Sequence, residues 1–128
     1  DLVRSRGLGD VYKRQMQKMQ EYDVLVLLEA VLKKGIFFAS KFTDYAQLNR
    51  PILAISPVNG FANSTLTLQG GGIAVNNENH KDIKKGILTL YKAWQENTLN
   101  EKYSTRQLYS RLSPEYVVNI YKNLLNAR

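Results

Sequence analysis

The sequence predicts an α/β fold, a partial Rossmann-like parallel sheet of about three strands flanked by helices. Two runs, 23–30 and 51–56, stay apolar over the length of a strand, which is typical of strands buried on both faces of a parallel sheet. A third, short strand is expected at 70–75, where three glycines lead into an apolar segment. Helical patterns separate and follow these runs, and this alternation predicts right-handed βαβ units.

The elements follow one another closely. Residues 16–22 have the pattern of a helix end, and the first strand, "DVLVLLEA", comes directly after them. Ser40 is expected to be the N-cap of a short helix at 41–49, because a serine side chain can accept a hydrogen bond from a free amide of the first turn. Pro51 opens the second strand, a position at which a sheet tolerates proline.

The second half of the chain is predicted to be mainly helical. A short helix is expected at 61–68, and Asn77 or Asn79 is expected to cap the longest helix. The apolar stripe of that helix, which we expect in the core, consists of Ile83, Ile87, Leu90, Tyr91 and Trp94. Two further helices are predicted at 105–111 and after the Ser-Pro-Glu at 113–115; the inward face of the last one comprises Val117, Ile120, Tyr121 and Leu124.

Composition limits the possible chemistry. The chain has 128 residues, no cysteine and one histidine, His80, so a disulfide framework, a thiolate metal site and a His-rich metal centre are excluded. No apolar run reaches the roughly 18 residues of a membrane span, and the cytoplasm is the default location. The net charge is +7, but the basic residues are scattered, so we expect a solvated surface and no nucleic-acid partner.

The first fifteen residues, "DLVRSRGLGDVYKRQ", do not share the pattern of the rest. The string at 5–15 resembles the translation of an adapter and transposon end used in library preparation for short-read sequencing. We therefore hypothesise that 1–15 is a non-native leader, disordered or poorly packed, and that native sequence starts near Met16. Without this leader, which has four basic and two acidic side chains, the net charge falls from +7 to +5.

The Ser-Lys pair at 40–41 is the strongest candidate for a binding site. In open α/β sheets, ligands bind beyond the carboxyl ends of the strands, where helix N-termini carry unpaired amides and a partial positive charge. The Ser40 hydroxyl, the first amides and the Lys41 ammonium would suit a diphosphate, and Asp44, one turn later, would suit a ribose diol. The sequence is equally compatible with a structural role, in which Ser40 only caps the helix and Lys41 and Asp44 are solvated.

The segment "ASKFTDYAQLNRPILAIS", with "GGGIAV" and the helices after it, resembles the C-terminal donor-binding domain of GT-B glycosyltransferases of family 4, the glycosyl transferases group 1 type. The resemblance extends over roughly residues 16–128. It implies that 16–128 is the C-terminal half of a donor domain. It also implies that Ser40, with the adjoining Lys41 and Phe42, binds the diphosphate of a nucleotide sugar and that Asp44 binds the ribose. Lys34 and Gly35 are further candidates for a phosphate contact.

The same resemblance implies the activity and the partners. The full enzyme would transfer a sugar from a nucleoside diphosphate to an acceptor such as a surface glycan or glycolipid, with no metal or other cofactor. It would do so in the cytoplasm, with association at the inner membrane face as a further expectation. Ala39 stands where the family has proline, and Lys34 stands near the first acid of its two-acid pattern. The catalytic residues are thus unknown.

The truncated chain, lacking the N-terminal acceptor domain, is expected to be inactive. A nucleotide-sugar 2-epimerase of the same architecture and a non-catalytic α/β interaction module remain as alternatives.

Overall fold

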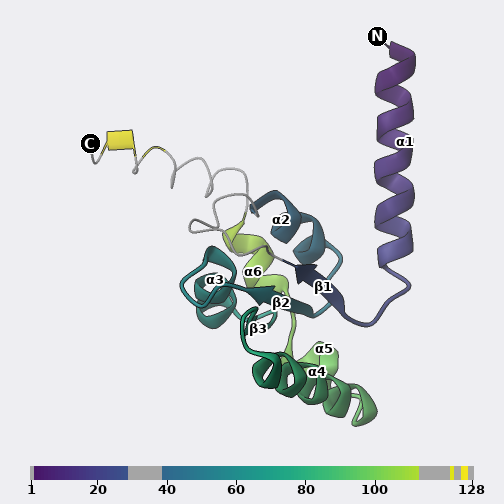
Figure 1. Ribbon diagram of the computed structural model, residues 1–128. Helices are drawn as coiled ribbons and strands as arrows, with labels where there is room; N and C mark the ends of the chain where they lie inside the picture. Colours follow the sequence, from purple (N-terminus) through teal and green to yellow (C-terminus); the bar gives the residue numbers. More distant parts are fainter. Residues whose placement is uncertain (1, 29–38, 113–121, 123–124, 127–128) are drawn as a thin grey trace.

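The computed structural model (Figure 1) describes residues 2–28, 39–112, 122, 125 and 126. Within these residues the chain forms a three-stranded sheet with helices on both faces and one helix that stands apart from the rest. The elements in chain order are α1 (Leu2–Met19), β1 (Leu25–Leu28), α2 (Ala39–Gln47), β2 (Ile52–Ser56), α3 (Phe61–Gln69), β3 (Gly72–Asn76), α4 (His80–Gln95), α5 (Leu99–Lys102) and α6 (Arg106–Arg111).

The sheet has the order β1-β2-β3, and both strand pairs are parallel. Leu25 lies opposite Ile52, and Ile52 lies opposite Gly72. A side chain at Gly72 would collide with the main chain of Ile52, so only glycine lets β3 approach β2 this closely. The predicted α/β class and the partial, all-parallel, Rossmann-like sheet are confirmed.

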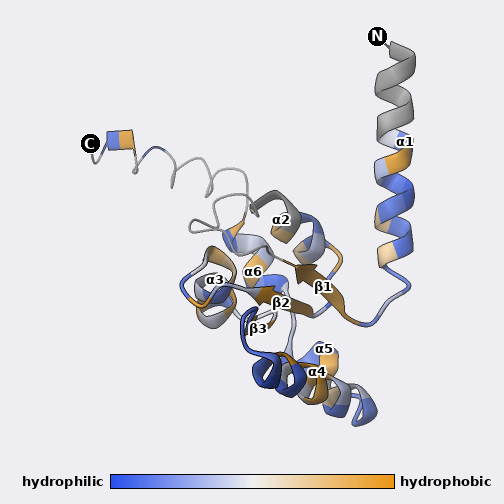
Figure 2. Ribbon diagram, viewed as in Figure 1, coloured by the Kyte–Doolittle hydropathy of each residue, from blue (hydrophilic) through white to orange (hydrophobic). Residues whose placement is uncertain are grey.

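The sheet buries one face against α2, α3 and α6. Strand residues alternate between the two faces, and Leu27, Ile52 and Ala54 point to this one. They pack with apolar side chains from the three helices, namely Phe42, Ala46, Ala62, Leu66, Leu108 and Leu112. Figure 2 shows the apolar colouring concentrated on the strands and on the helix sides that cover them.

The opposite face is covered only in part. Leu53 and Val75 pack there against Leu90 and Ala93 of α4, with Leu99 of α5. The side chains of β1 on this face, Val26 and Leu28, remain 52% and 69% exposed. Helix α4 therefore shields β2 and β3 but not β1.

The residues predicted to start α4 and to end α3 have these roles in the structure. The Asn79 side chain accepts hydrogen bonds from the amides of Lys81 and Asp82, which confirms it as the cap of α4. Gly70 and Gly71 have φ of 74° and 95°, so the glycine run is the turn that ends α3 and starts β3. Because that conformation disfavours side chains, the glycines have a structural role here.

Two sequence predictions are wrong. Ser40 lies inside α2, which begins at Ala39, so it is not the N-cap. In the stripe expected in the core, Ile87 is 49% exposed, and Tyr91 and Trp94 are 52% and 50% exposed. Tyr91 and Trp94 stack on each other, with ring centroids 5.7 Å apart, at the edge of α4 where no described helix covers the sheet. The helical period correctly predicted that these side chains share one face of α4, but they would be buried only if another element packed against that face.

Helix α1 contains most of the predicted leader. It extends away from the sheet (Figure 1), and its described side chains are almost all exposed. The helix ends at Met19, inside the 16–22 segment that has the pattern of a helix end. No helix among the described residues is long and apolar enough to cross a membrane. The last predicted helix, with Val117, Ile120, Tyr121 and Leu124, lies outside the described residues.

Helix α6 is attached to α2 by a buried hydroxyl. Thr105 is fully buried, and its Oγ1 donates a 2.7 Å hydrogen bond to the Ala46 carbonyl. Its amide donates to the Asn49 side chain, so one residue joins the end of α2 to the start of α6.

We predict that Thr105→Val lowers the free energy of unfolding by about 0.5–1.5 kcal/mol, because it removes the buried hydrogen bond to the Ala46 carbonyl, which keeps only the Asn49 amide as a donor, at nearly constant volume. Urea denaturation followed by circular dichroism measures this change. Ser110→Ala, at an exposed hydroxyl of α6, should change stability by no more than about 0.5 kcal/mol. Equal losses in the two variants would contradict the proposed attachment.

Candidate functional site

The topology places the first turn of α2 at the carboxyl edge of the sheet. Helix α2 ends at Gln47, and residues 48–51 connect it to the amino end of β2. Because β1 and β2 are parallel, the connecting helix must run back along them. Its first turn therefore lies where β1 ends, which is the edge at which ligands bind in open α/β sheets.

The first turn of α2 contains Ser40 and Lys41 as helical residues. The first amides of a helix have no acceptor within it, and no acidic residue lies in this turn to neutralise the partial positive charge. The structure describes the main chain but not the side chains of Ser40 and Lys41, and Lys34 and Gly35 lie outside the described residues. The amides of the first turn of α2, which were predicted to bind a diphosphate, thus lie together at this edge. The positive end of the helix dipole there favours an anion.

The side chain of Phe42 cannot contact a diphosphate. Its ring is fully buried in the core, and it meets Phe61 edge-on with ring centroids 5.8 Å apart. Only the main chain of Phe42 could therefore take part in binding. The ring contact also has a geometric consequence, because it joins the first turn of α2 to the first residue of α3.

Asp44 already has a partner. The Tyr12 hydroxyl of α1 donates a 2.6 Å hydrogen bond to Asp44 Oδ1. This hydrogen bond is the main reason why the pKa of Tyr12 is raised above its usual value, with desolvation and the charge of Asp44 as smaller causes. The acid predicted to bind ribose is consequently in contact with a residue of the presumed leader.

Ser56 and the start of α3 were not predicted to belong to a binding site, although a helix was expected from residue 61. Ser56 is the last residue of β2 and is 1% exposed, and its Oγ has no hydrogen-bond partner. Helix α3 begins after Gly60, and no side chain caps it. A serine at the end of an apolar run, followed by a turn and a helix, was the available signal, but a buried unpaired hydroxyl can be seen only in three dimensions.

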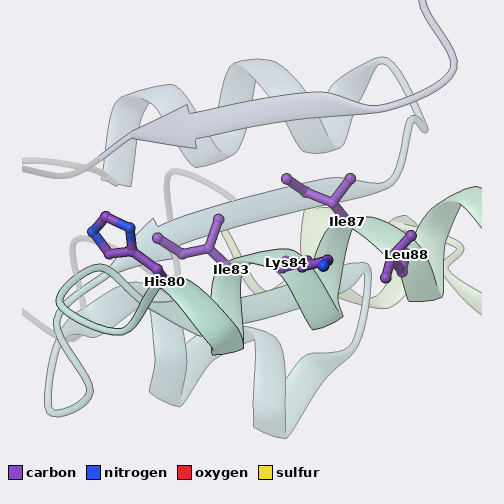
Figure 3. Close-up of a pocket in the computed structure, with 5 residues that line it drawn as sticks. All are labelled: His80, Ile83, Lys84, Ile87 and Leu88. Atoms are coloured by element: carbon purple, nitrogen blue, oxygen red, sulfur yellow. The ribbon is translucent and has the colours of Figure 1, made fainter.

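Two pockets lie along α4, on the opposite face of the sheet from α2. A groove of about 510 Å³ lies between β1 and α4, and its lining includes Val26, Tyr91, Trp94 and Asp23, whose carboxylate accepts a 3.1 Å hydrogen bond from Trp94 Nε1. A smaller pocket of about 260 Å³ on α4 is lined by His80, Ile83, Lys84, Ile87 and Leu88 (Figure 3). His80 is exposed, as expected, and no group of three potential metal ligands occurs within the described residues.

Comparison with family models, with curated proteins and with solved structures returned no match to this chain.

We predict that Tyr12→Phe strengthens nucleotide binding about threefold if Asp44 binds ribose, because the tyrosine hydroxyl then no longer competes for Oδ1. Titration with UDP, followed by the amide signals of α2, measures the affinity. Tyr22→Phe, at an exposed tyrosine just after α1, is the control and should have no effect. An unchanged affinity in Tyr12→Phe would remove Asp44 from the site.

Proposed function

We propose that this chain is the C-terminal part of a glycosyltransferase that uses a nucleoside-diphosphate sugar, and that the first turn of α2 binds the donor diphosphate. One observation carries the proposal: α2 begins at the carboxyl edge of a parallel sheet, with the Ser-Lys pair in its first turn and Asp44 one turn later. A donor site formed by the segment 39–56 would need this arrangement.

The physical chemistry of that turn favours a diphosphate over a neutral ligand. Unpaired amides and the helix dipole attract anions, and no carboxylate in the first turn competes. Lys41 adds a full positive charge in the same turn. Asp44 is partly exposed, and its carboxylate, which accepts from the Tyr12 hydroxyl, could accept a hydrogen bond from a ribose hydroxyl in its place.

The full enzyme would transfer the sugar to an acceptor such as a surface glycan or glycolipid, in the cytoplasm and with association at the inner membrane face. Its acceptor domain would lie outside this chain. The donor diphosphate would be stabilised by helix amides and basic groups, and no metal or other cofactor is required by the proposal. Lys34 and Gly35 stay as candidates for a further phosphate contact.

We predict that UDP or GDP shifts the amide NMR signals of Ser40 and Lys41, and that Lys41→Ala weakens the affinity about tenfold because a charge-assisted hydrogen bond to phosphate is lost. Lys84→Ala, at an exposed lysine of α4, is the matched control and should change affinity less than twofold. If nucleotides shift no signal in α2, or if both lysine variants behave alike, the proposed donor site is wrong.

We also predict that the chain does not hydrolyse or transfer sugar from UDP- or GDP-sugars, because the acceptor-side groups lie outside it. Chromatographic detection of free UDP or GDP after long incubation tests this prediction. Release of nucleoside diphosphate that Lys41→Ala abolishes would show that the chain contains its own catalytic groups.

A further inference from the structure

The first turn of α3 lies beside the first turn of α2. Phe42, in the first turn of α2, and Phe61, the first residue of α3, are in edge-to-face contact with ring centroids 5.8 Å apart. Helix α3 follows β2 as α2 follows β1, so both helices start at the carboxyl edge of the sheet and on the same face. The positive ends of two helix dipoles therefore converge at one place.

The start of α3 is free to bind an anion. The helix has nine residues, its N-cap is Gly60, and no side chain forms a capping hydrogen bond. Its first turn contains no acidic residue. The Ser64 hydroxyl donates to the Gly60 carbonyl, and no described main-chain group accepts from the amides of Phe61 and Ala62.

An unpaired buried hydroxyl lies at the same edge. Ser56 shares the strand face of Ile52 and Ala54, which is the face that α2 and α3 cover. Its carbonyl accepts a hydrogen bond from the Asn77 amide, but Oγ, in a residue only 1% exposed, has no partner. Nearly all buried polar groups are hydrogen-bonded, so the unpaired Ser56 hydroxyl is a candidate to bind a ligand or a water at this edge.

We propose that Ser56 and the first turn of α3 form a second phosphate subsite, so that a diphosphate spans the start of α2 and the start of α3. One phosphoryl group would accept hydrogen bonds from the first amides of α2. The other would accept them from Ser56 Oγ and the amides of Phe61 and Ala62. This inference rests on the proposed function for the role of α2, and it adds a specific partner for the second phosphate.

A substitution at Ser56 separates binding from folding. Ser56→Ala removes a hydroxyl that has no partner, so the melting temperature should stay the same or rise. The same change should weaken binding of inorganic pyrophosphate about tenfold. Ser64→Ala, which removes a serine hydroxyl from α3, is the matched control and should leave the affinity for pyrophosphate within twofold of the wild type. A Ser56→Ala variant that binds pyrophosphate as the wild type does would overturn the subsite.

Amide NMR of the wild-type chain provides the second measurement and does not depend on any variant. With inorganic pyrophosphate, we expect shifts at Ser40 and Lys41 and also at Phe61 and Ala62. Orthophosphate, which cannot span both turns, should bind at least tenfold more weakly. Shifts confined to α2, or the absence of any shift, would overturn the second subsite.

The two proposals can fail separately. If pyrophosphate shifts both turns but UDP and GDP bind no more tightly than pyrophosphate and do not perturb Asp44, the subsite stands and the nucleotide-sugar function is wrong. If UDP perturbs α2 and Asp44 while Phe61 and Ala62 stay unchanged, the function stands and the subsite is wrong.

Discussion

Parallel strand pairing is the constraint from which the rest of this structure follows. Two parallel neighbours cannot be joined by a tight turn, so each connection must return along the sheet, here as α2 and α3. Both helices then start at the carboxyl edge and lie on one face, where Phe42 and Phe61 can meet. The concentration of free amides at that edge is thus a consequence of strand direction and needs no specialised loop.

The same sheet explains the apolar surface of the molecule. A parallel sheet is normally covered on both faces, but among the described elements only α4 and α5 lie on the second one. Val26 and Leu28 of β1 are left exposed next to Tyr91 and Trp94. This uncovered surface borders the groove between β1 and α4, whose lining includes Val26, Tyr91 and Trp94.

The sequence predicted the features that depend on local pattern. The apolar runs identified the strands, Asn79 identified the start of α4, and the glycine run identified the turn before β3, because each signal involves only neighbouring residues. Predictions that depend on which surface lies nearby were less successful. Tyr91 and Trp94 belong to the predicted stripe, yet the element that would bury them does not occur among the described residues.

Features that require distant residues could not be predicted at all. Tyr12 and Asp44 are 32 positions apart, and no periodicity indicates that they meet. The unpaired state of Ser56 depends on the packing around it. Helix α2 begins at Ala39, two residues before the predicted start at 41, a shift within the usual uncertainty of helix ends, but one that changes the role of Ser40.

Charge balance at the carboxyl edge shows what the two helix starts can and cannot do. Each helix N-terminus contributes roughly half an elementary charge, so α2 and α3 together supply about one positive charge. The diphosphate of free UDP or GDP carries about two to three negative charges near neutral pH, because its terminal phosphate ionises near pH 6. The diphosphate of a nucleotide sugar is esterified at both ends and carries about two. Lys41 supplies a second positive charge, and the remainder for free UDP or GDP must come from basic groups beyond the two helix starts. Binding of an anion at this edge is therefore expected to weaken as the salt concentration rises.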